Sequence, residues 1–124
     1  MKHATDYLEA ANAVVPRITP EQGIEIHNGG GGVFVDVRDS SDIAKTGTIN
    51  GALRIPRGFI EFAADNAHPL HNEAMEKSRD IVLVCAAGGM AALAGKTLSE
   101  MGYTKVHNVG GIGDWINAGG ETES

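Results

Sequence analysis

Cysteine is the scarcest reactive residue of this chain, because its 124 residues include only one, Cys85. A single cysteine excludes a disulfide within the chain and removes any internal thiol that could resolve an intermediate on Cys85. It also fits a reducing compartment and leaves one thiol free for chemistry. On this count alone, Cys85 could equally be a small buried hydrophobic residue, which is the commoner fate of a free cysteine.

Long apolar runs and clusters of basic residues are also missing. No stretch approaches the roughly 20 apolar residues needed to cross a bilayer, and the first residues lack the apolar segment of a secretion signal. With 10 Lys and Arg against 16 Asp and Glu, the net charge is −6, which disfavours nucleic acid and anionic membranes as partners. We therefore expect a cytoplasmic protein that binds neither.

Candidate metal ligands are too few at any one place. His68 and His71 stand close together, but two histidines fall short of the three or four ligands that zinc takes. We therefore expect no metal and no other cofactor. Two further histidines, His27 and His107, are expected to be packing or surface residues.

The composition is that of one soluble globular domain, with 42% hydrophobic and 21% charged residues. A chain of this length can bury a single core, and a second domain is not expected. Apolar residues at helical spacing, stopped by Pro16, predict an N-terminal helix. We accordingly divide the chain into a peripheral helix at residues 1–18 and one domain at residues 19–124.

Hydrophobic periodicity predicts strands that alternate with helices. Apolar and β-branched runs predict strands at residues 33–37, 52–55, 81–84 and 105–109. Helical spacing with capping and stop residues predicts helices at 6–15, 19–27, 41–45, 58–67, 73–77, 90–101 and 112–116. The alternation implies an α/β fold with an open, mainly parallel sheet and helices on both faces. Ligands bind at the carboxyl edge of such sheets, where Asp36 and Cys85 are expected to lie.

The loop that follows the strand at 81–84 is the best candidate site. It begins at Cys85 and continues through Ala86, Ala87, Gly88, Gly89 and Met90 into a predicted helix. Free N–H groups of such a loop and the positive end of the helix dipole favour negative charge, including that of a thiolate. Cys85 is therefore the candidate catalytic nucleophile and the five following residues are candidates to bind the substrate, while from the loop alone a buried structural cysteine stays open as the alternative.

Five motifs in register resemble the rhodanese-like sulfurtransferase domain. They are V-D-V-R at 35–38 with Asp42, G-T-I-N-G-A at 47–52, the strand into Cys85, V-G-G at 109–111, and Trp115 with Gly119. The resemblance implies a sulfurtransferase whose cysteine takes a sulfane sulfur from thiosulfate or a persulfide donor, holds it as a persulfide and passes it to a thiol or cyanide. It also allows a protein as sulfur donor or acceptor.

Two positions depart from the family pattern. Met90 stands where active members often carry arginine, and Thr48 replaces the histidine of the family's G-H-I motif. The rim near Cys85 is therefore apolar, which favours a weakly charged persulfide donor over dianionic thiosulfate. Cysteine phosphatases carry an arginine where this chain has Ala91, so phosphate chemistry is nearly excluded. A sulfur-carrier module and a regulatory module with little turnover on small donors stay open as alternatives.

Several charged residues lie near the predicted strand ends. We expect Asp36 and Arg38 to be structural, with Arg38 paired to Asp42 four residues further on. Arg54 and Arg57 are the candidates to add positive charge around the pocket.

Overall fold

The computed structural model describes residues 1–124, which form two sheets. The larger sheet has four parallel strands in the order β3, β1, β4, β5, and the smaller pairs β2 with β6 in antiparallel fashion. The strands are β1 (Gly32–Asp36), β2 (Thr48–Ile49), β3 (Leu53–Arg54), β4 (Asp80–Cys85), β5 (Val106–Gly111) and β6 (Thr122–Glu123). The predicted α/β fold with an open, mainly parallel sheet is confirmed.

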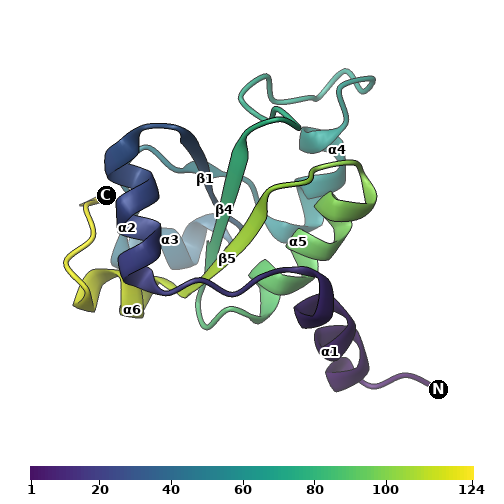
Figure 1. Ribbon diagram of the computed structural model, residues 1–124, viewed down its shortest axis with the longest axis horizontal. Helices are drawn as coiled ribbons and strands as arrows, with labels where there is room; N and C mark the ends of the chain where they lie inside the picture. Colours follow the sequence, from purple (N-terminus) through teal and green to yellow (C-terminus); the bar gives the residue numbers. More distant parts are fainter.

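Helices cover both faces of the parallel sheet. They are α1 (Ala4–Val14), α2 (Pro20–Gly29), α3 (Ser40–Thr46), the 3-10 turn η1 (Arg57–Phe59), α4 (Ile60–Ala64), α5 (Gly89–Glu100) and α6 (Ile112–Asn117). In Figure 1, α2, α3 and α6 lie to the left of the central strands, and α1, α4 and α5 lie to the right. None of these helices combines the length and the apolar character that crossing a membrane requires.

The side chains of β4 alternate between two cores. Ile81, Leu83 and Cys85 belong to the core that lies under α4 and α5, whereas Val82 and Val84 belong to the core under α2 and α6. All five are buried. This period of two follows from the pleat of a strand, and it turns the thiol toward α5.

The second core is organised around Trp115, which is fully buried. The rings of His27 and Phe34 pack against the indole edge to face. The indole Nε1 donates to the carbonyl oxygen of Glu121 at 3.0 Å, so its polar group is satisfied despite burial. His107, in contrast, is partly exposed, and its Nε2 bonds to the carboxylate of Asp80.

The prediction of a helix at residues 73–77 is wrong. Asn72 instead organises a turn, because its side-chain oxygen accepts the amide of Ala74 at 3.0 Å. The carbonyl oxygen of Met75 accepts the hydroxyl of Tyr103, as does that of Ala64. These side-chain bonds, one from nearby Asn72 and one from distant Tyr103, satisfy backbone groups that a helix would have used, so the segment forms turns despite its apolar spacing.

The predicted helix at 58–67 is shorter than expected and starts as a 3-10 turn. It ends at Ala64, and the following Asp65 adopts an extended conformation and accepts the amide of Ala67 through its carboxylate. The small sheet of β2 and β6 was not predicted, because each strand has only two residues. Gly47, with φ of 75°, approaches the carbonyl of Glu123 so closely that no Cβ would fit.

Helix α1 packs on α5 rather than standing free. Val15, just after α1, lies so close to Gly95 of α5 that a Cβ there would come within 2.8 Å of its side chain. The chain then runs beside β5, where Arg17 and Asn108 form an isolated parallel bridge. The N-terminal segment therefore reaches the sheet next to the strand that flanks Cys85.

Candidate active site

Cys85 ends β4 at the carboxyl edge of the parallel sheet, opposite Gly111 of β5. Its side chain is 1% exposed and belongs to the core under α5. Helix α5 begins only four residues later, at Gly89, and has no acidic residue in its first turn. The thiol therefore faces the positive end of a twelve-residue helix dipole that no nearby carboxylate on that helix opposes.

Two backbone amides point at the sulfur. The N–H of Gly88 donates to Sγ at 3.0 Å, and the N–H of Ala91 donates at 3.4 Å. Gly88 has φ of 106°, a conformation that only glycine adopts without strain, and it is what turns the loop into α5. Amides fixed in this way stabilise negative charge on a thiolate or on a sulfur attached to it.

The five residues predicted to bind the substrate divide into two groups. Ala86 and Ala87 are exposed at the crest of the loop, while Gly88 is buried and Gly89 is half-buried at the start of α5. Met90 is 37% exposed, so its side chain belongs to the rim and not to the core. The amide of Ala91, outside the predicted set, is the second donor to the sulfur.

The loop rests so closely on β5 that the strand has no room for a side chain at residue 111. A Cβ on Gly111 would collide with the carbonyl oxygen of Ala86. The buried side chain of Asn108 donates from Nδ2 to the carbonyl oxygen of Gly88 at 2.9 Å and accepts the amide of Gly110 at 2.8 Å. Asn108 thus fixes the residue whose own amide binds the sulfur, a role that the sequence alone did not reveal.

Arg17 is the second neighbour of the loop that sequence reasoning missed. Its guanidinium lies against Gly88, where an added Cβ would come within 2.7 Å of Nη1, and also against Gly110. In the sequence, Arg17 stands 68 residues before Cys85 in a connecting segment, with no motif around it. Only the pairing of that segment with β5 brings the two together.

A buried ion pair lies on the strand beside β4. The carboxylate of Asp36 is 0% exposed and accepts from Nη2 of Arg38 at 2.8 Å and from the hydroxyl of Thr48 at 2.7 Å. Arg38 is 4% exposed and also donates to the carbonyl oxygen of Gly47. Each charge is thus desolvated and bonded on several sides, which is the arrangement of a structural pair.

The predicted pairing of Arg38 with Asp42 is wrong. Helix α3 begins at Ser40, so Arg38 precedes the helix and does not share a helical face with Asp42, which is exposed. The side chain of Arg38 turns back to its own strand instead. Thr48, at the family's histidine position, directs its hydroxyl to Asp36 and not to the cysteine loop.

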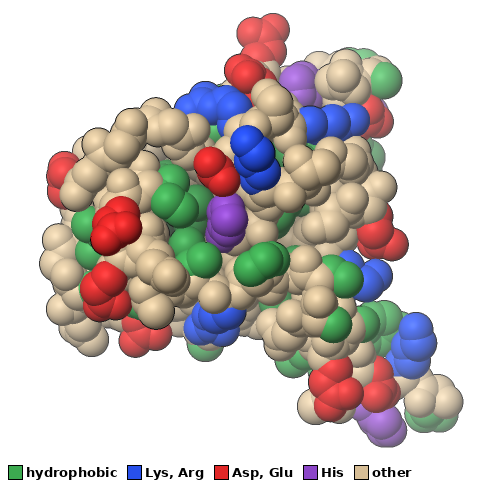
Figure 2. Space-filling view, viewed as in Figure 1, with side chains coloured by type: hydrophobic (Ala, Val, Ile, Leu, Met, Phe, Trp, Pro, Cys, Tyr) green, Lys and Arg blue, Asp and Glu red, His purple; other side chains and the backbone are tan.

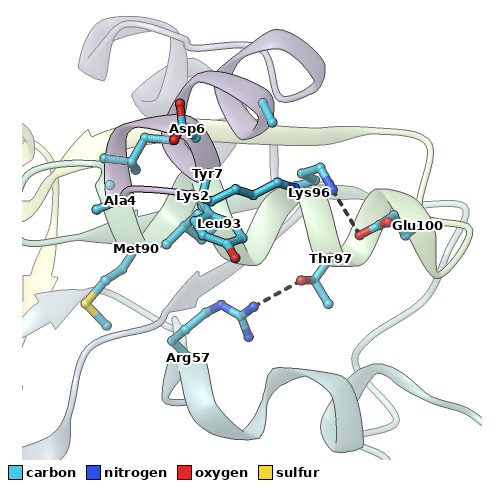
Figure 3. A pocket seen from close by; sticks show the side chains of 13 residues that line it. Lys2, Ala4, Asp6, Tyr7, Arg57, Met90, Leu93, Lys96, Thr97 and Glu100 are labelled. Carbon is cyan, nitrogen blue, oxygen red and sulfur yellow. Dashed lines mark hydrogen bonds and ion pairs between the residues drawn. The ribbon is translucent and has the colours of Figure 1, made fainter.

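A groove of 610 Å³ adjoins the rim of the loop and lies between α1, α5 and η1. Figure 3 shows Met90 at one end, with its sulfur directed away from α5, and Arg57 below the helix. Arg57 donates to the hydroxyl of Thr97 and pairs with Glu61. Cys85 does not line the groove, but Gly89 and Met90, the last two residues of its loop, do.

Neither of the two arginines predicted to add charge around the Cys85 pocket is bonded to the loop, and Arg57 lines the separate groove between α1, α5 and η1. Arg54 pairs with Glu123 at 3.2 Å and with the carbonyl oxygen of Ser124, so it ties the C-terminus to β3. A contribution of Arg57 to the charge around Cys85 stays a prediction, whereas Arg54 is committed to the C-terminus.

The family model of the rhodanese-like domain matches residues 19–118. The chain belongs to this family. A sulfurtransferase of Allochromatium vinosum is 33% identical over 88 residues, covering 70% of this chain and 74% of the relative. The thiosulfate sulfurtransferase PspE of Escherichia coli is 35% identical over 66 residues, 53% of this chain and 58% of the relative. Relatives of this rhodanese-like chain thus carry sulfurtransferase names at modest identity.

Among solved structures, a protein of unknown function from Rhodopseudomonas palustris, described as a possible tyrosine phosphatase, superposes with a TM-score of 0.92 at 34% identity. The match covers 99% of this chain and 96% of that one. It therefore includes helix α1, which precedes the residues of the rhodanese-like domain.

Proposed function

We propose that this rhodanese-like protein is an enzyme that transfers a sulfane sulfur through a persulfide on Cys85. The observation that carries the proposal is the pair of amide donors on Sγ, at 3.0 Å from Gly88 and 3.4 Å from Ala91. The N–H of Gly88 belongs to a loop that β5 and Asn108 support, and the N–H of Ala91 belongs to the first turn of α5. Donors fixed before the reaction stabilise an anion without reorganisation.

In the first half-reaction, the thiolate of Cys85 attacks the outer sulfur of thiosulfate. A bond forms between Sγ and that sulfur, the sulfur–sulfur bond of thiosulfate breaks, and sulfite leaves with the electron pair. The product is a cysteine persulfide with one negative charge on its outer sulfur. Amides in the loop then hold this charge as they held the thiolate.

In the second half-reaction, a nucleophile attacks the outer sulfur of the persulfide. Cyanide takes it as thiocyanate, and a thiolate takes it as a new persulfide, while Sγ leaves as the thiolate that the amides stabilise. Because Cys85 is the only cysteine, no second thiol of this chain competes as acceptor. The acceptor must come from outside, as a small molecule or as a partner protein.

A phosphatase reaction is not supported by the loop. Ala91 occupies the position at which cysteine phosphatases carry arginine, and it is fully buried with its amide bonded to Sγ. A phosphate dianion at this loop would lack the bidentate clamp that arginine provides. We therefore do not propose for this chain the phosphatase activity that is suggested for the Rhodopseudomonas protein.

A sulfur-carrier module is the second candidate, and the observation that favours it is the rim. Met90 is 37% exposed where active members often carry arginine, and the adjoining groove includes the apolar side chains of Leu8 and Leu93. An apolar rim fits a protein persulfide or a singly charged thiol persulfide better than a free dianion. In this function, turnover on small donors would be negligible.

Steady-state kinetics separate the two candidates. The enzyme predicts thiocyanate formation from thiosulfate and cyanide, or from a small persulfide and cyanide, with loss of all turnover in Cys85→Ser. The carrier predicts that the protein becomes persulfidated once from a persulfide donor but shows no turnover with either small donor. Unmodified protein under every donor would contradict both.

A further inference from the structure

The segment between α1 and α2 holds Arg17 in a fixed place beside the loop. The amide of Ile18 donates to the carbonyl oxygen of Asn108 at 3.0 Å, and the amide of Asn108 donates to that of Pro16 at 3.0 Å. These bonds bracket Arg17 and attach its backbone to β5. Since Asn108 also holds Gly88, the arginine and the loop share one support.

The guanidinium of Arg17 lies directly on two glycines. An added Cβ would come within 2.7 Å of Nη1 at Gly88 and within 3.2 Å of Nε at Gly110. Both glycines have positive φ, 106° and 90°. A side chain at either position would displace the guanidinium, so the lack of a side chain at Gly88 and at Gly110 is what lets the guanidinium lie against the loop.

Arg17 is also the one arginine whose charge is not used by the protein itself. The other four donate to protein oxygens: Arg38 to Asp36, Arg54 to Glu123, Arg57 to Glu61 and Arg79 to the backbone. Arg17 makes no side-chain hydrogen bond and no ion pair, and it is exposed. An unbonded guanidinium beside a cradle of amides is free to bind an anion.

The charge of Arg17 is close enough to act at the thiol. Its contact with Gly88, whose amide lies 3.0 Å from Sγ, puts Nη1 within about 9 Å of the sulfur. This is about one Debye length at physiological salt, so the attraction is only partly screened. Arg17 is a local positive charge on a protein that is acidic as a whole, because the net charge is −6. Figure 2 shows acidic side chains over α1 and α2.

We propose that Arg17 supplies the positive charge that the loop lacks at Met90, and so determines whether this protein accepts an anionic sulfur donor. The inference rests on the proposed sulfur transfer and adds the residue outside the loop that decides between an anionic and a weakly charged sulfane donor. Arg17 acts as a positioning residue through its charge, while the amides of Gly88 and Ala91 hold the reacting sulfur.

Replacement of the charge alone tests the proposal. Arg17→Met keeps a long side chain over Gly88 and Gly110 but removes the guanidinium. We expect KM for thiosulfate to rise roughly tenfold with little change in kcat, and Arg17→Lys to keep most of the wild-type KM. Added salt should raise the wild-type KM and leave that of Arg17→Met nearly unchanged.

A weakly charged donor distinguishes charge from structure. With a singly charged thiol persulfide, Arg17→Met should change kcat/KM by no more than about threefold, since the Coulomb term scales with the donor's charge. Equal losses with both donors, or an unchanged KM for thiosulfate, would overturn the proposal. The control is Arg79→Met, which removes an arginine bonded to Gly31 at the opposite end of β4 and should leave both donors unaffected.

Binding without turnover keeps this test separate from that of the proposed function. Titration calorimetry measures the affinity of Cys85→Ser for thiosulfate. This affinity should fall roughly tenfold when Arg17→Met is added. Equal affinities of the single and double variants would refute the role of Arg17 even in a protein that transfers sulfur. Conversely, the expected weakening would support it even if no persulfide formed on the wild-type protein.

Discussion

Two regions lie side by side at the carboxyl edge of the sheet, and they use charge in opposite ways. The pair of Asp36 and Arg38 is buried and every charged group in it is bonded within the protein. The Cys85 loop contains no charged side chain, and the cation that lies against Gly88, Arg17, is unbonded. Groups that are satisfied inside the fold hold the edge together, whereas backbone amides and an unbonded guanidinium are left for a substrate.

The largest effect on stability should come from the buried pair. Asp36→Ala leaves Arg38 buried without its carboxylate partner and also frees the hydroxyl of Thr48, so we expect a loss of about 3–5 kcal/mol in the free energy of unfolding. Denaturant unfolding measures this. Replacing both charges, as in Asp36→Leu with Arg38→Met, should recover part of the loss.

This comparison breaks if Asp36→Ala folds with wild-type stability but loses sulfur transfer. Asp36 would then be part of the catalytic machinery, and its burial with Arg38 would be incidental. Turnover of the folded fraction of Asp36→Ala decides between the two.

Next in size is the effect of a single methyl group under the loop. Gly111→Ala puts a Cβ against the carbonyl oxygen of Ala86, so the loop must move although φ at residue 111 suits any residue. Misplaced amides should lower kcat/KM by about 10²-fold. The matched control is Gly113→Ala in α6, where nothing lies within 4 Å of the added Cβ.

For Gly113→Ala we expect wild-type kinetics and a slightly higher stability, since alanine favours a helix over glycine by up to about 1 kcal/mol. If Gly111→Ala has wild-type kinetics as well, the shape of the loop does not limit the reaction. The role assigned to the amides of Gly88 and Ala91 would then be wrong.

A charge added at the rim should help thiosulfate in particular. Met90 is partly exposed, so Met90→Arg brings a guanidinium to the rim without burying it. A charge-assisted hydrogen bond contributes about 1.5–3 kcal/mol, which predicts a gain of roughly tenfold in kcat/KM for thiosulfate. Met90→Leu, which stays apolar, should show no gain.

The same substitution sharpens the role of Arg17. In the Arg17→Met background, Met90→Arg should restore thiosulfate use, because either guanidinium can supply the missing charge. A stable Met90→Arg protein with no improvement in either background would mean that charge at the rim does not limit donor use. The sulfur-carrier function would then be favoured.

The smallest effect concerns the C-terminal strand. The amide of Gly51 and then the guanidinium of Arg54 lower the pKa of Glu123 from its ordinary value of 4.5. A lowered folded-state pKa means that the contribution to stability is present above pH 4.5 and is lost as the pH falls through the folded pKa. The melting temperatures of the wild type and Glu123→Gln should therefore converge on acidification. A gap that stays constant with pH would exclude this linkage.

The strands of the parallel sheet and the site loop were predictable because their signals are local. The apolar run into Cys85 and the glycines after it predict a strand, a loop and a helix start. The prediction of a helix at 73–77 failed because the hydroxyl of Tyr103, far away in the sequence, donates to the carbonyl oxygen of Met75. The roles of Arg17 and Asn108 were not predicted for the same reason. Only the tertiary structure, in which Arg17 pairs with Asn108 of β5, brings both residues to the loop.

The proposal rests most directly on whether Cys85 carries sulfur. Intact-mass spectrometry of the protein after exposure to thiosulfate or a thiol persulfide measures this, with and without subsequent reduction. We expect a gain of one sulfur atom that reductant removes, and no gain in Cys85→Ser. A wild-type protein that gains no sulfur from any donor, or a Cys85→Ser variant that gains as much, would contradict sulfur transfer through this residue.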